Sequence, residues 1–222
     1  MSDLDFSVVL SYREALLRGL LYTIQLTLVC GVLSLLFGFM ISIGRQSRFA
    51  PVRWVSALYV EILRGTPVLI TLFWVFFCFP LLFGFQFSPF FSSIIALTLF
   101  TSAIMSESFR SALKSVGEDQ YDACKALGIS GFVQSVFVVA PQAVMRAIPN
   151  LVSNIVSLFK ESALVSAVGV IELMYTAQNI SNTTARPVEV LTVAALIYFV
   201  IGWLLTRVAN YAESRLIARM SL

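Results

Sequence analysis

Residues 19–44, GLLYTIQLTLVCGVLSLLFGFMISIG, contain no charged side chain. A helix needs about 20 apolar residues to cross the hydrocarbon core of a bilayer, so this stretch is long enough to span a membrane. The segment that follows it, RQSRFAPVR at 45–53, carries three arginines. Because Lys and Arg concentrate in cytoplasmic loops, the sequence predicts that this loop is cytoplasmic and that the N-terminus lies outside.

The composition supports an integral membrane protein. The chain has 222 residues, of which 59% are hydrophobic and only 12% charged, whereas soluble domains carry about 25% charge. The net charge of +3 is small and does not suggest nucleic-acid binding. Histidine, the commonest general base and metal ligand, is absent, and Cys30, Cys78 and Cys124 lack metal-site spacing. We therefore expect no enzyme activity, no catalytic residue, no metal site and no disulfide.

The rest of the chain divides into further apolar segments. Residues 65–106 are again free of charge but too long for one helix, and Pro80, Gly84 and Pro89 interrupt them. The predicted fold is all-α: a single polytopic membrane domain over residues 1–222, with a polar external loop at 178–188 and a cytoplasmic C-terminal tail. The five predicted spans cover about 19–44, 54–82, 90–112, 150–175 and 189–207.

A less hydrophobic region, residues 115–141, separates the third and fourth predicted spans and is predicted to be cytoplasmic. Its core is Asp122, two small residues, Gly128 and finally Pro141. Glycine adopts positive φ readily, and proline disfavours the interior of a helix, so the spacing predicts a short helix, a sharp turn and a second helix. We call this region, residues 115–141, the knob. A cytoplasmic projection of this shape suits contact with a soluble partner.

Two pairs of charged residues lie close to the predicted cytoplasmic ends of the spans. Glu61 and Arg64 are three residues apart, as are Glu107 and Arg110, so each pair lies on one face of its helix. Each pair is interpreted either as a structural ion pair near the headgroups or as part of a functional site. In the motif 64–67, Gly65 and Pro67 loosen the helical hydrogen bonding, which fits either an ordinary kink or backbone that lines a cavity.

Lys160, Glu161 and Ser162 fall near the middle of the predicted fourth span, where an unpaired charge costs several kcal/mol. Neighbouring helical residues diverge by about 100°, so Lys160 and Glu161 do not face the same partner. They are interpreted as residues of a substrate path or of inter-helix pairs. Glu172, near the outer end of this span, is expected to line an external vestibule or to meet water.

With these residues in place, the chain resembles the permease subunits of ABC importers, in the polar amino-acid uptake group of the binding-protein-dependent transport system inner-membrane component family. The coupling motif of that family is Glu-Ala-Ala, three residues, Gly, nine residues, Ile, one residue, Leu-Pro. Every spacing of the motif is preserved here in Asp122, Ala123, Cys124, Gly128, Val138, Ala140 and Pro141. Segments 19–27, 64–67 and 160–164 also resemble the family, so the resemblance covers about residues 16–210.

The sequence departs from the family pattern at a few positions. Asp122 replaces glutamate and Cys124 replaces the second alanine of the motif. Thr71 stands where glutamine is common, and residues 104–106 lack a tyrosine that is often found there. These departures leave the class unchanged and leave the identity of the substrate open.

The resemblance implies a function and a set of partners. The chain would form half of a path for a polar amino acid in the bacterial cytoplasmic membrane, together with a second, identical or homologous permease subunit. Two ATP-binding subunits would contact the loop through Asp122, Ala123, Cys124, Lys125, Gly128 and Pro141, and a solute-binding protein would deliver the substrate outside. Substrate-path candidates are Arg64, Thr66, Glu107, Lys160, Glu161 and Ser162.

Cofactors are not expected in this chain. It lacks the G-x-x-x-x-G-K-[ST] phosphate loop, so ATP would be bound by the partner subunit. The alternative class is an ion-coupled secondary transporter or channel subunit that uses Lys160 and Glu161 as a relay.

Overall fold

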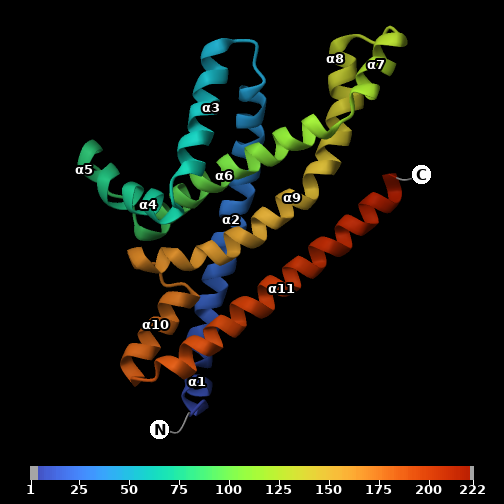
Figure 1. Ribbon diagram of the computed structural model, residues 1–222. Helices are drawn as coiled ribbons and strands as arrows, with labels where there is room; N and C mark the ends of the chain where they lie inside the picture. The colour runs from blue at the N-terminus through green and yellow to red at the C-terminus, as the bar shows by residue number, and fades with distance from the viewer. Residues whose placement is uncertain (1–4, 221–222) are drawn as a thin grey trace.

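The computed structural model describes residues 5–220, with side chains described through residue 211. The described part is helical and contains no strand, which confirms the predicted all-α class. Figure 1 shows long helices that cross one another at steep angles, with short helices at both ends of the molecule. The helices are α1 (Ser7–Ser11), α2 (Arg13–Arg45), α3 (Ala50–Gly65), α4 (Val68–Phe73), α5 (Phe79–Phe83), α6 (Pro89–Ser115), α7 (Glu118–Ala126), α8 (Gly131–Val133), α9 (Ala140–Glu161), α10 (Leu173–Thr184) and α11 (Pro187–Met220).

Four helical segments of the described chain are long and apolar enough to cross a membrane: Arg13–Arg45, Pro89–Ser115, Gly131–Val168 and Pro187–Tyr211. The bent pair formed by Ala50–Gly65 and Val68–Phe83 makes a fifth if it is counted as one span. Large apolar side chains, such as Met40 on α2 and Phe199 on α11, remain exposed on the outer faces of these helices. A bilayer is the solvent that suits such a surface, so the polytopic membrane fold is confirmed.

The interface between α2 and α6 is built from small residues. Ser34 on α2 donates a hydrogen bond to the carbonyl of Thr98 on α6 at 3.4 Å, and Gly38 lies directly against Ser102 and Met105. Membrane helices have little hydrophobic incentive to associate in lipid, so they depend on such small residues for close van der Waals packing. The apolar core continues from this interface through Leu26, Cys30, Leu97 and Leu158.

Replacing Gly38 by alanine is expected to destabilise the fold by about 1–3 kcal/mol, because the new methyl group would overpack the interface. A Cβ at this position would lie 2.9 Å from Met105 Cβ and 3.0 Å from the backbone oxygen of Ser102. Gly31→Ala is the matched control on the same helix, since its Cβ would meet only Leu158 Cδ2, at 3.9 Å. Thermal unfolding of the purified protein measures both variants, and equal midpoints would contradict the packing described here.

The second predicted span, 54–82, corresponds to two helices with a break between them at residues 66–67. α3 ends at Gly65, α4 begins at Val68, and the two segments are bent by 109°. Pro67 has no backbone N–H to continue the ladder, and Thr66 turns its hydroxyl back to the carbonyl of Ile62 at 3.0 Å. The motif at 64–67 is therefore a sharp break, and α3, α4, α5 and α6 line an open apolar cavity of about 510 Å³ at the bend.

The predicted limits of the fourth span and of the loop after it also differ from the structure. The helix starts at Gly131 and ends at Val168, so it begins well before residue 150 and stops before residue 175. The loop predicted at 178–188 is helical as far as Thr184, since α10 occupies Leu173–Thr184. In both places the prediction assigned polar residues to loops. Arg146 and the Asn/Thr residues of α10 instead lie on helices.

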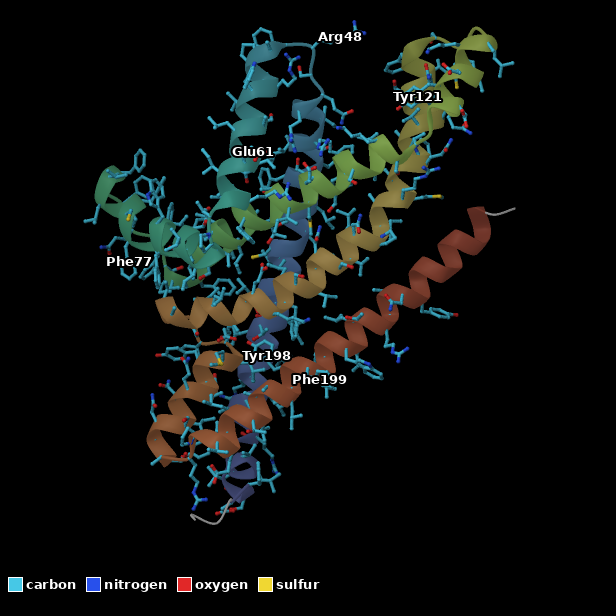
Figure 2. The ribbon with its side chains drawn as sticks, viewed as in Figure 1. Arg48, Glu61, Phe77, Tyr121, Tyr198 and Phe199 are labelled. Atoms are coloured by element: carbon cyan, nitrogen blue, oxygen red, sulfur yellow. The ribbon has the colours of Figure 1, made fainter. Side chains whose placement is uncertain are left out.

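The two ends of the molecule carry different elements. In Figure 1 the N-terminus lies at the lower end with α1, α10 and the start of α11, whereas α7, α8 and the turn after α2 lie at the upper end. Arg48 and Tyr121 mark this upper end in Figure 2. The C-terminus points toward the same upper end, so the two termini lie at opposite ends of the molecule.

Candidate functional site

The turn between α7 and α8 has the geometry that the spacing of Gly128 predicted. Gly128 has φ of +66°, in the left-handed region that favours glycine. Its N–H donates to the carbonyl of Lys125 at 3.0 Å, and the N–H of Ile129 donates to the carbonyl of Cys124 at 3.0 Å. This pair of bonds is the Schellman motif, which ends α7 and reverses the chain into α8.

The short helix α7 is held against the helix that follows it. Gln134 donates from its side chain to the carbonyl of Tyr121 at 3.4 Å, and Gln142 donates to the side chain of Gln120 at 3.3 Å. Arg146 donates to the carbonyl of Ser115, just before α7. A small apolar cluster of Val116, Val139 and Ala143 lies beneath these bonds. These contacts join the knob to the end of α6 and to the start of α9.

Cys124 lies beneath the exposed surface of the knob. Its side chain is buried within this chain, whereas Ala123 on the preceding position is exposed. The small size at position 124 thus serves the packing of α7 on its own support. Asp122 and Lys125, three residues apart on α7, form an ion pair at 3.0 Å.

The exposed surface of the knob is more apolar than the motif alone suggested. Leu127, Phe132 and Phe137 have exposed fractions of 77%, 73% and 70% in this chain. Leu127 follows the last residue of α7, Phe132 lies on α8, and Phe137 lies on the π-helical segment Gln134–Val139. Large apolar side chains exposed on such short elements are typical of an interaction surface. We call Ala123, Leu127, Phe132 and Phe137 the knob face. The coupling motif does not include Leu127, Phe132 and Phe137. The apolar residues on either side of Gly128 could have indicated that this surface is apolar.

Pro141 lies within a helical segment. Proline disfavours the interior of a helix, yet one helical segment extends from Gly131 to Val168. Pro141 is the second residue of α9, and only Ala140 separates it from the π-helical segment Gln134–Val139. The wider π turn accommodates the missing N–H and the ring, as it does before Pro80, which follows the π-helical segment Trp74–Cys78.

Glu107 lies at the centre of a cluster of arginines. Arg45 contacts its Oε2 at 2.5 Å, Arg110 donates to it from Nε at 2.9 Å and from Nη2, and Arg64 lies 3.9 Å away. The predicted pair of Glu107 and Arg110 is present. The predicted pair of Glu61 and Arg64 is not, because Arg64 faces Glu107 instead. These contacts join α2, α3 and α6, which favours a structural role for Glu107 over a place in a substrate path.

The run at Lys160, Glu161 and Ser162 ends α9 and begins a 3-10 helix that extends to Val168. The two charged side chains diverge, as predicted: Lys160 is exposed and approaches Gly202 of α11, while Glu161 is partly buried. No salt bridge to either is present among the described side chains, so inter-helix pairing within this chain finds no support. Ser162 is buried and donates to the carbonyl of Phe159 at 2.7 Å.

Glu172 was expected to meet water or a vestibule, and this expectation is wrong. Its side chain is completely buried and caps the N-terminus of α10, accepting from the N–H groups of Met174 and Tyr175 at 2.9 and 2.8 Å. Tyr198 of α11 donates to it at 2.6 Å and Thr23 of α2 at 3.3 Å. Figure 2 shows Tyr198 where α11 crosses the other long helices. Glu172 thus ties three helices together.

The chain is similar to known proteins along nearly its whole length. Residues 32–218 match the model of the family described as binding-protein-dependent transport system inner membrane component. The arginine transport system permease protein of Bacillus subtilis is 32% identical, and the match covers 96% of this chain and 98% of that protein. The L-cystine transport system permease protein of the same organism is 35% identical, with 93% and 88% covered.

A solved structure of an amino acid ABC transporter, crystallised with histidines, shares the fold. It has a TM-score of 0.93 and 29% identity, and the match covers 96% of this chain and 99% of that one. With a helical membrane fold, a helix-turn-helix knob and a family match over most of its length, this chain belongs to the family of binding-protein-dependent transport system inner membrane components.

Proposed function

We propose that this chain is the permease subunit of an ATP-driven importer for a polar amino acid and that the knob face docks on an ATP-binding subunit. The observation that carries the proposal is the attachment of an exposed apolar surface to α6 and α9 by hydrogen bonds and an apolar cluster. ATP would be bound by the partner, and its closure would move the knob and with it the long helices.

The proposed arrangement in the membrane follows from the knob. A surface that docks on an ATP-binding subunit must lie in the cytoplasm, and the C-terminus points toward the same end of the molecule. In this arrangement the N-terminus would lie outside the cytoplasmic membrane, as the arginines after α2 also predict. A single permease domain of this size would pair with a second, identical or homologous subunit, and a solute-binding protein would deliver the substrate from outside.

Glu161 is the residue of this chain that we propose to face the substrate. It is partly buried, lies at the end of α9 and has no salt bridge among the described side chains, so its charge is available to a ligand. A carboxylate at this depth suits a cationic or zwitterionic amino acid better than an acidic one. The similarity to permeases named for arginine and L-cystine is consistent with this choice.

Glu161→Gln is expected to reduce uptake of cationic amino acids about tenfold, because it removes one charge-assisted contact worth about 1.5–3 kcal/mol. Lys160→Met is the matched control, since the exposed Lys160 points away from Glu161. Uptake of a panel of cationic, neutral and acidic amino acids by the reconstituted complex measures both. A loss in Lys160→Met with none in Glu161→Gln would reverse the assignment and favour an acidic substrate.

A further inference from the structure

The charged residues at the upper end of the molecule surround a cavity that the proposed transport function does not use. The cavity has a volume of about 410 Å³ and opens between the ends of α2 and α6, beside α3 and α7. Three of its lining residues are cationic, and Tyr121 of the knob closes one side of it. The lining consists of Arg45, Gln46, Ala57, Arg110, Leu113, Lys114 and Tyr121.

The charges around this cavity do not balance. Arg45, Arg64 and Arg110 share the single carboxylate of Glu107, and no ion pair of Lys114 occurs among the described side chains. Around the cavity, four cations therefore stand against two carboxylates, those of Glu107 and of Glu61, which attracts Arg110 without forming an ion pair with it. The C-termini of α2 and α6 contribute about half a negative charge each. An excess of about one positive charge remains, which an anion carrying a single negative charge would neutralise.

Hydrogen-bond donors are also available in the cavity. Arg110 uses Nε and Nη2 to bind Glu107, and its Nη1 donates no hydrogen bond to another described side chain or backbone group. The ammonium group of Lys114 supplies three more donors. A phosphate group accepts several charge-assisted hydrogen bonds of this kind, and guanidinium groups match its geometry.

The position of the cavity in the membrane indicates which kind of molecule would supply the phosphate. α2 is long enough to span the membrane and ends at Arg45, so the cavity lies at the depth of the lipid headgroups on the side of the knob. Basic pockets between transmembrane helices on the cytoplasmic side bind the headgroups of anionic lipids. We propose that this cavity binds the phosphate of an anionic membrane phospholipid, in contact with α2, α6 and Tyr121 of the knob.

Native mass spectrometry of the full chain in its assembled complex tests the proposal. The probes are phosphatidylglycerol and phosphatidylcholine with identical acyl chains, which share the phosphate and differ in net charge. We expect phosphatidylglycerol to be retained about fivefold more, and Lys114→Gln to remove most of that preference, as one cation near a membrane surface contributes about this factor. Lys125→Gln, outside the cavity on the knob, is the matched control and should retain the preference.

A second variant keeps the test informative if Lys114→Gln folds poorly. Ala57→Leu fills the cavity from α3 without changing any charge, and it should also lower retention of phosphatidylglycerol. Equal retention of the two lipids, or no effect of either variant, would overturn the site. Binding of inorganic phosphate in phosphatidylcholine alone, lost in Lys114→Gln, would overturn the lipid assignment in favour of a soluble phosphate. None of these readouts depends on transport, so a failure here leaves the transport function untouched.

Discussion

Replacing Gly128 by valine is expected to reduce substrate-stimulated ATP hydrolysis of the reconstituted complex about tenfold or more. Gly128 has φ of +66°, and a residue with a Cβ loses about 1–2 kcal/mol in this conformation, with a larger loss for a branched side chain. The space around the position is open, with nothing within 4 Å of a new Cβ. The loss would therefore come from the backbone, which must abandon the Schellman turn and change the angle between α7 and α8.

Two controls separate this effect from a general sensitivity of the knob. Gly128→Asn should retain most of the stimulated activity, because asparagine tolerates the left-handed region better than other residues with a Cβ. Gly131→Val adds the same side chain three residues later, at a glycine that lacks a positive φ and has equally open surroundings. Unchanged stimulated turnover in Gly128→Val would show that the turn does not transmit movement between the subunits.

Replacing Glu172 by alanine is expected to cost about 3 kcal/mol of stability, the sum of a lost N-cap and of buried donors left without an acceptor. The carboxylate accepts from two N–H groups of α10, from Tyr198 of α11 and from Thr23 of α2. Three of these donors would lose their partner at once, whereas the Thr23 hydroxyl would keep the carbonyl of Gly19 at 3.1 Å. A midpoint of thermal unfolding about 5 °C or more below that of the unsubstituted protein is the expected result.

A graded series of variants tests whether Glu172 holds three helices together or behaves as an ordinary surface carboxylate. Tyr198→Phe removes one donor and leaves the carboxylate with its other three, so about 1 kcal/mol is expected. Glu161→Gln is the functional counterpart, because its carboxylate has no ion pair among the described side chains. It should leave the unfolding midpoint almost unchanged while it impairs uptake. Equal midpoints for Glu172→Ala and Glu161→Gln would contradict the tie between α2, α10 and α11.

Local patterns predicted local structure well. The charge-free stretches identified membrane segments because the requirement for about 20 apolar residues acts on contiguous sequence. The turn at Gly128 was predictable because a left-handed residue after a short helix has few alternatives to glycine. The pair of Glu107 and Arg110 followed from helical spacing alone.

Contacts between distant segments were not predictable in the same way. The role of Glu172 depends on Thr23 and Tyr198, which approach it only after α2 and α11 have packed. Arg64 leaves its sequence neighbour Glu61 for Glu107, because the packing of α3 on α6 brings that carboxylate closer. The sequence located the break at Pro67, but the 109° angle is set by how α4 packs on α6.

ATP-dependent uptake tests the central claim most directly. Proteoliposomes containing this chain, its ATP-binding subunit and its solute-binding protein would be assayed with a labelled cationic amino acid. Uptake is predicted to require ATP together with both partner proteins and to fall about tenfold in Gly128→Val. Uptake that proceeds without ATP under an imposed ion gradient would contradict the importer and favour an ion-coupled secondary carrier.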